Sequence, residues 1–272
     1  MYKRQGGDAK LLAGGQSLVP MLNFRLLRPS ILVDINRIPD MSFIAEDGGA
    51  IRVGALTRHH QLETSPLIAA HLPVVTEAMG HVAHLAIRNR GTIGGSLSHA
   101  DPAAELPMLA VLLDASLAIA SSGGQRTVKA RDFFLDALTV DLADDELVTG
   151  VVFPKLAPAT GWGFAEVARR DGDFALGCAA VTLTVVGGKV AAARIAMMGI
   201  GKTPLRATEA ENALIGCAIE PATLEAAAEA ARAAVEPQTD LHASSDYRRH
   251  LVGVLVQQTL RDAWQRATGA DA

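Results

Sequence analysis

Two short segments combine consecutive glycines with a hydroxyl residue that follows them, AGGQS at residues 13–17 and TIGGS at residues 92–96. Glycine lacks a Cβ, so the backbone of such a loop can approach an anion closely, and consecutive N–H groups can form an anion-binding nest. A helix that begins directly after the loop adds partial positive charge. One glycine pair more often marks a tight turn. Two loops of like chemistry, 80 residues apart, instead predict a cradle in two parts that suits a diphosphate.

Other site signatures are not found in the sequence. It has no GxGxxG that opens a βαβ unit and no GxxxxGK[ST], so neither a Rossmann site nor a Walker-type hydrolase is supported. Ser17, Ser96 and Ser98 lie outside a GxSxG motif and have no assignable base, which argues against hydrolase catalysis. His81 and His84 are spaced like metal ligands, but no carboxylate or cysteine completes the set nearby, so we expect no metal site.

Polar residues also surround the second loop. Arg88 and Arg90 fit either solvated surface charges or supports for the loop. Asp101 precedes a proline and fits a turn or a helix N-cap. Glu105 falls in the first turn of a helix expected over residues 103–113, where it either complements the helix dipole or accepts a hydrogen bond from a ligand hydroxyl such as a ribose.

The elements that must position these loops can be predicted from the pattern. Three further glycine pairs, at 48–49, 123–124 and 187–188, separate β-prone runs and predict hairpin turns. Strands are expected at residues 31–34, 146–153, 176–186 and 189–198. Helices are expected at residues 58–63 with Thr57 as cap, and at 74–82, 206–215, 221–234 and 247–266. In the last helix, Leu251, Val254, Leu255 and Gln258 form a mostly apolar stripe, and the doublet Arg248–Arg249 is expected at the surface, or facing a partner or a cofactor phosphate.

Composition sets the class of protein. The chain has 272 residues, enough for about two domains, and 49% of them are apolar, which excludes a disordered protein. The net charge of −4 disfavours a nucleic-acid binder, and no apolar run is long enough to span a membrane. No secretory signal is visible, so we expect a cytoplasmic protein. Cys178 and Cys217 lack ligand-spaced partners, which excludes a self-contained iron–sulfur or zinc site.

Two prolines in residues 154–161 mark a boundary near residue 156, which separates residues 1–156 from residues 157–272. The first part mixes strands and helices, and the second runs from strands to helices. This order predicts an α+β arrangement in both parts rather than a repeating βαβ wheel.

Three stretches together resemble the medium, FAD-binding subunit of the molybdenum hydroxylases, the group of aerobic carbon monoxide dehydrogenase and the xanthine dehydrogenase family. They are LLAGGQSLVPMLNFRLLRPSILVDINRI, AIRNRGTIGGSLSHADPAAELP and ARRDGDFAL, and DYRRHLVGVL also looks like the family's C-terminal segment. The resemblance implies a vanillyl-oxidase-type (PCMH-type) FAD-binding domain of two α+β subdomains, followed by a smaller C-terminal α+β domain of an antiparallel sheet plus helices.

The resemblance also implies the site and the partners. The residues that match the two pyrophosphate-binding loops are Ala13, Gly14, Gly15, Gln16, Ser17, Thr92, Ile93, Gly94, Gly95 and Ser96. Glu105 matches an acidic residue near the FAD ribose, and Val148 an apolar residue near the flavin or the adenine. Members of the family pass electrons from a molybdopterin-binding large subunit through a [2Fe-2S] small subunit to FAD, and then to NAD, a quinone or another acceptor. The iron–sulfur centres would belong to a partner chain, which agrees with the low cysteine count.

One departure from the family concerns the start of the chain. The family usually has a strand and a helix before the first loop, whereas only twelve residues precede Ala13 here, so we expect that this strand–helix unit is missing.

Two alternatives to an electron-relay subunit remain open. One is a stand-alone flavoenzyme of the same fold type, such as an alcohol oxidase or a cell-wall sugar reductase. The other is a non-catalytic nucleotide-binding or scaffold protein.

Overall fold

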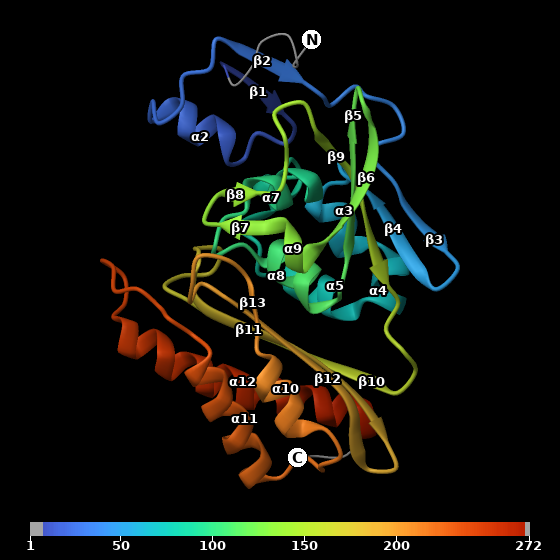
Figure 1. The fold of residues 1–272 in the computed structure, drawn as a ribbon, viewed down its shortest axis with the longest axis vertical. Helices are drawn as coiled ribbons and strands as arrows, with labels where there is room; N and C mark the ends of the chain where they lie inside the picture. The colour runs from blue at the N-terminus through green and yellow to red at the C-terminus, as the bar shows by residue number, and fades with distance from the viewer. Residues whose placement is uncertain (1–7, 270–272) are drawn as a thin grey trace.

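The computed structural model describes residues 8–269 and begins with a small subdomain of two strands and one helix (Figure 1). Strands β1 (Ala9–Leu12) and β2 (Ile31–Asp34) pair in parallel, and α2 (Leu18–Asn23) lies in the connection between them. The connection starts with the first glycine loop. None of these three elements makes an extensive contact with a helix or strand outside the subdomain, although the side chains of Leu11 and Val33 pack against the main core.

The second subdomain is built on a five-stranded antiparallel sheet in the order β3-β4-β9-β5-β6. Its strands are β3 (Ile44–Asp47), β4 (Ala50–Gly54), β9 (Leu147–Pro154), β5 (Ser116–Ser121) and β6 (Gly124–Lys129). Hairpins β3–β4 and β5–β6 turn at the two predicted glycine pairs, and Gly48 and Gly124 have positive φ, which confirms both turns.

Short helices cover this sheet, with a small two-stranded ribbon beside them (Figure 1). The helices are α3 (His59–Thr64), α4 (Pro66–His71), α5 (Pro73–Met79), α6 (Leu85–Arg88), α7 (Ile93–His99), α8 (Glu105–Leu112) and α9 (Ala130–Phe133). The ribbon is formed by β7 (Phe134–Asp136) and β8 (Thr139–Val140). Helix α8 is buried from Leu106 to Leu112 and forms the centre of the core. The expected cap at Thr57 was wrong: Arg58 occupies the N-cap of α3, while the Thr57 hydroxyl bonds both backbone groups of Phe43.

The C-terminal part is a four-stranded antiparallel sheet, β10-β11-β12-β13, covered by three helices on one face. Its elements are β10 (Thr160–Ala168), β11 (Ala175–Val186), β12 (Lys189–Met198), β13 (Leu205–Arg206), α10 (Thr208–Leu214), α11 (Pro221–Ala233) and α12 (Ser245–Thr268). Side chains alternate across β11: Cys178 and Ala180 face the core of the first part, whereas Ala179 and Val181 face the helices. The β11–β12 hairpin turns at the third predicted glycine pair.

The long helix α12 begins at an N-cap, Ser244, whose hydroxyl accepts a hydrogen bond from the Tyr247 N–H. The expected apolar stripe was wrong in part. Leu251 and Leu255 are buried, but Val254 and Gln258 are exposed, because the buried face runs through neighbouring positions that include Val252 and Val256. No helix in the described part of the chain is long and apolar enough to cross a membrane. The observed elements confirm the α+β fold class.

Candidate functional site

The two glycine loops lie against each other in the structure. Gly14 is buried, and a Cβ built on it would lie 2.9 Å from the Cα of Gly91 and nearer still to the carbonyl oxygen of Arg90. Only a residue without a side chain can therefore occupy position 14 at this separation. Both loops line one cleft of about 1380 Å³, so segments 80 residues apart in sequence share a single cavity.

The first loop leaves its backbone donors free. Among the described residues, no acceptor takes a hydrogen bond from the N–H groups of residues 14–17. Gly15 has φ +74°, a conformation that favours glycine and turns the chain sharply before α2. The Gln16 side chain donates to the Gly14 carbonyl oxygen at 2.9 Å and braces the turn. Since buried or half-buried N–H groups normally have partners, this loop is suited to an anionic ligand.

The second loop uses its backbone donors inside the protein. Ile93 N–H donates to the Thr57 oxygen at 3.0 Å, and Gly94 N–H donates to the Ala55 oxygen at 2.8 Å. Gly95 N–H donates to the Thr92 hydroxyl at 3.1 Å. The expectation of an N–H nest at this loop was therefore wrong. Gly94 is needed for packing, since its Cβ would lie 2.6 Å from the Ala55 Cβ.

Nearly all residues predicted for the site border the cleft. They are Ala13, Gly14, Gly15, Gln16, Ser17, Thr92, Gly94, Gly95, Ser96, Glu105 and Val148. Ile93 is the exception, since its side chain is fully buried in the core and does not line the cleft. Asp101 accepts a hydrogen bond from the Ala103 N–H at 2.9 Å, which confirms it as a turn residue between α7 and α8. Arg88 donates to the carbonyl oxygens of Val82 and Ala83, so it supports the segment that leads to the loop.

Glu105 places a carboxyl group at the cleft wall, at the start of α8, and this group has no side-chain partner among the described residues. Burial raises the pKa of Glu105 to about 7, and the charge of Asp101 adds to the shift. Glu166 lies opposite Cys178 on neighbouring strands, with one buried carboxylate oxygen unbonded. Burial, and then the charge of Glu105, raise the pKa of Glu166 to about 8. Two weakly acidic carboxyl groups therefore lie near the junction of the two parts.

The C-terminal part supplies the opposite wall of the cleft, and sequence reasoning missed most of it. Phe174 is 71% exposed and borders the cleft, an unusual position for a large aromatic side chain. Its only signal was its place in the stretch ARRDGDFAL. Arg248 was expected at the surface but is buried. It donates to the carbonyl oxygens of Leu176 and Gly199 and to the Asp240 carboxylate, so it holds this wall together.

His59 also borders the cleft, beneath the second loop. A Cβ on Gly91 would meet its ring at 2.9 Å, so the ring packs directly against the backbone that leads to the second loop. Burial lowers the pKa of His59 to about 4, so the ring is neutral at pH 7. Nothing in the sequence distinguished this histidine from its neighbour His60, because burial depends on the tertiary fold.

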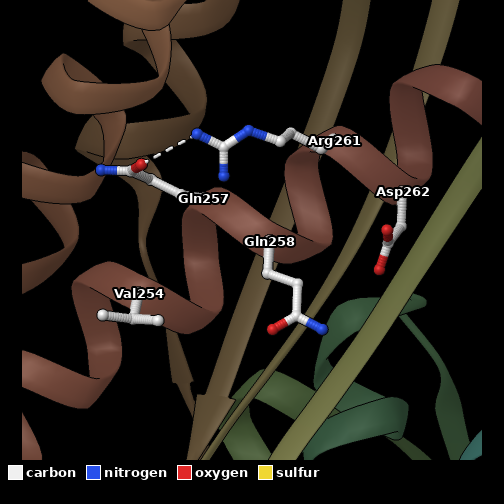
Figure 2. A pocket seen from close by; sticks show the side chains of 5 residues that line it. All are labelled: Val254, Gln257, Gln258, Arg261 and Asp262. Carbon is white, nitrogen blue, oxygen red and sulfur yellow. Dashed lines mark hydrogen bonds between the residues drawn. The ribbon is translucent and has the colours of Figure 1, made fainter. Parts of the chain in front are cut away.

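A shallow depression along α12 lies apart from these residues, and Figure 2 shows its lining. Its walls come from one helix, and Gln257 accepts a hydrogen bond from Arg261 at 3.2 Å. No side chains converge on it from a second element, so it offers no binding site. Within residues 8–269, no group of three or more potential ligands could hold a metal ion.

Family models match both parts of the chain. Residues 1–156 match the FAD binding domain in molybdopterin dehydrogenase, and residues 162–263 match the CO dehydrogenase flavoprotein C-terminal domain. The two glycine loops lie in the region that matches the first model, and Phe174 and Arg248 lie in the region that matches the second.

Known proteins are similar to this chain over almost its whole length. The carbon monoxide dehydrogenase medium chain of Hydrogenophaga pseudoflava is 38% identical over 96% of this chain and 91% of that protein. Subunit alpha of the 6-hydroxypseudooxynicotine dehydrogenase complex of Paenarthrobacter nicotinovorans is 44% identical, covering 96% and 89%.

Solved structures agree. A carbon monoxide dehydrogenase structure from Hydrogenophaga pseudoflava has a TM-score of 0.96 and 40% identity, covering 97% of this chain and 92% of that one. Quinoline 2-oxidoreductase from Pseudomonas putida 86 gives a TM-score of 0.90 and 42% identity, covering 97% and 90%. These matches confirm the fold expected from the resemblance and FAD as the cofactor. The chain belongs to the FAD-binding medium subunits of the molybdenum hydroxylases, an oxidoreductase family.

Proposed function

We propose that this chain is an electron-transfer subunit that receives electrons from a [2Fe-2S] partner and passes them through FAD to an external acceptor such as NAD or a quinone. The observation that supports this most directly is the meeting of the two glycine loops at one cleft, with free donors on the first loop. FAD supplies the redox chemistry when bound, and the chain's own residues bind and orient it.

The residues around the cleft fit the parts of this cofactor. The free N–H groups of residues 14–17 suit the diphosphate, and the hydroxyls of Ser17 and Ser96 add donors beside it. The Glu105 carboxyl suits a ribose hydroxyl, and Val148 gives an apolar contact. The exposed ring of Phe174 suits an aromatic ring system by stacking.

The proposed division of labour follows from the fold. Residues 1–156 form the FAD-binding domain and residues 157–272 a C-terminal domain that closes the cleft from the other side. The proposed partners are a molybdopterin-binding large subunit and a [2Fe-2S] small subunit, and the proposed location is the cytoplasm. The substrate of the complex would bind the molybdenum subunit, so this chain does not define it.

The test uses the full chain and its complex. The purified chain, titrated with FAD, is expected to bind one equivalent, with flavin absorbance in the visible range and quenched flavin fluorescence. Co-expression with the large and small subunits encoded by neighbouring genes is expected to give substrate-dependent flavin bleaching that requires both partners. Bleaching of the isolated chain by a small substrate would instead support a stand-alone flavin oxidoreductase, and a colourless protein after reconstitution would refute the proposal.

A further inference from the structure

The first glycine loop belongs to a subdomain that is weakly attached to the rest of the chain. Strands β1 and β2 pair in parallel, but neither strand nor α2 packs extensively on a helix or strand outside this subdomain. The second loop lies in the other subdomain, held by bonds to Thr57 and Ala55. A diphosphate that contacts both loops needs them at one separation. Leu11, Ala13 and Val33 pack against the main core, and polar side chains add direct bonds between the loops themselves.

Two polar side chains bridge this gap. Asn36, just after β2, donates from Nδ2 to the Ala13 carbonyl oxygen at 2.9 Å, immediately before Gly14. Its Oδ1 accepts a hydrogen bond from Arg58 Nη2 at 2.8 Å. Arg58 Nη1 donates to the Arg90 carbonyl oxygen at 2.6 Å, the same oxygen that a Cβ on Gly14 would meet. The chain of bonds thus runs from one loop to the other.

We propose that Asn36 and Arg58 form a clamp that fixes the two glycine loops at the separation required for FAD, before the cofactor binds. Neither side chain borders the cleft, so both are positioning residues that act through the backbone carbonyls of Ala13 and Arg90. This inference rests on the proposed function for its ligand but not for its geometry.

The planar guanidinium explains why arginine suits this position. Its two terminal nitrogens donate in a fixed fork, one to Asn36 and one to Arg90, which a lysine ammonium cannot reproduce with the same geometry. Asp34 orders Asn36. Its carboxylate accepts a hydrogen bond from the Asn36 side chain at 2.7 Å and another from the Asn36 N–H at 2.9 Å. Asn36 is therefore ordered by its own neighbour, and ordering it in advance lowers the entropic cost of binding.

The test compares Arg58→Ala, Arg58→Lys and Asn36→Ala with Arg37→Ala. Arg37 is an exposed neighbour of Asn36 that makes no hydrogen bond among the described residues, so its variant controls for the loss of positive charge. We expect Arg58→Ala and Asn36→Ala to raise the Kd for FAD at least tenfold and Arg58→Lys to recover part of the affinity. We expect the Kd for FAD of the Arg58→Ala, Asn36→Ala double variant to be no higher than that of the single variant with the lower affinity, since the two residues act as one unit. If Arg58 and Asn36 only stabilised the fold, their variants would instead lower the Tm of the apo protein as much as the Tm of the FAD-bound protein.

A second measurement needs no cofactor. Amide hydrogen exchange of the apo full chain is expected to speed up in the paired strands β1 and β2 of Arg58→Ala, with β5 and β9 unchanged. Unchanged exchange, or an FAD Kd within twofold of the wild type, overturns the clamp. If the wild-type chain does not bind FAD, the proposed function fails, and the exchange experiment still decides whether the clamp holds the loops.

Discussion

Gly14 lies so close to Arg90 that no Cβ fits between them, and this contact joins two loops from different subdomains. The contact is between backbone atoms, so no side-chain rearrangement at either residue relieves a substitution. The geometry makes Gly14 the position at which the smallest chemical change has the largest effect on the cleft.

Gly14→Ala is expected to push the loops apart. Overpacking of this kind costs about 1–3 kcal/mol of folding stability. It should also raise the Kd for FAD at least tenfold, because the free N–H groups of residues 14–17 move relative to the second loop. Urea unfolding of the apo protein and fluorescence titration with FAD measure the two effects. Gly49→Ala is the control, since a Cβ there meets nothing within 4 Å and its φ is not positive. Equal affinity of the two variants would contradict the prediction.

Gly94→Ala tests the packing role of the second loop. The added methyl would lie 2.6 Å from the Ala55 Cβ and 2.8 Å from the Ala55 oxygen, so we expect a loss of about 1–3 kcal/mol of stability. Ala55→Gly removes only one of the two clashes and should restore part of the loss in the double variant. Thermal unfolding of the four proteins measures the coupling. Additive effects would show that the two positions do not press on each other.

The Glu105 carboxyl makes a pH-dependent prediction about the cofactor. Its pKa of about 7 means that it is largely protonated below that pH in the apo protein, and the protonated group can donate as well as accept. Glu105→Gln keeps a donor and an acceptor but cannot ionise. We expect the wild-type FAD Kd to change between pH 6 and 8 and that of the variant to change less. Parallel Kd-versus-pH curves would remove Glu105 from the site.

Several elements followed from local sequence, and the reasons are physical. The hairpins at the three glycine pairs and the strand Ile31–Asp34 depend on turn chemistry and alternation, which neighbouring residues determine. Strand β10 was missed because Gly161 and Gly163 weaken a strand pattern. A Cβ at Gly163 would lie 2.7 Å from the Cα of Thr259 in α12, so the glycines are explained only by a helix that packs there.

In the candidate site, too, the sequence indicated what neighbouring residues determine and not what tertiary contacts determine. The motifs identified the residues of both loops, because glycine and hydroxyl types are visible in the sequence. They did not reveal that the donors of the second loop bond to Ala55 and Thr57, since those acceptors lie about 40 positions earlier. The burial of Arg248 and the exposure of Phe174 were likewise hidden. The first depends on bonds to Leu176 and Gly199, which are far from Arg248 in the sequence, and the second on the position of Phe174 at the cleft.

Glu166 makes a prediction about stability and pH. Its pKa in the folded protein is raised to about 8, above the ordinary value of 4.5, so the folded state holds this proton longer than the unfolded state. Stability from this group is therefore full below about pH 4.5 and is lost as the pH rises towards 8. Glu105 contributes in the same direction up to about pH 7.

We expect Glu166→Gln to weaken this dependence and to be more stable than the wild type at pH 8, because an amide avoids the cost of a buried charge. Urea unfolding at pH 5, 6, 7 and 8 measures it. Glu220→Gln is the control, because Glu220 is exposed and its carboxyl makes no hydrogen bond among the described residues, and it should leave the slope unchanged. An equal slope for Glu166→Gln and the wild type would rule out the raised pKa.

The adjacent pair Arg248 and Arg249 gives a matched comparison on one helix. The Arg248 side chain is 8% exposed and donates to two carbonyl oxygens and a carboxylate. That of Arg249 is 42% exposed, donates to the Val235 carbonyl oxygen at 3.3 Å and lies 4.0 Å from Asp246. Arg248→Met leaves the half-buried carbonyl oxygens of Leu176 and Gly199 without this donor, so we expect a loss of about 2–4 kcal/mol. Arg249→Met should cost less than about 1 kcal/mol. Since Leu176 and Gly199 border the cleft, Arg248→Met should also weaken FAD binding, while Arg249→Met should not. Chemical unfolding and FAD titration of both variants check the difference, and equal losses would mean that Arg248 does not hold the cleft wall.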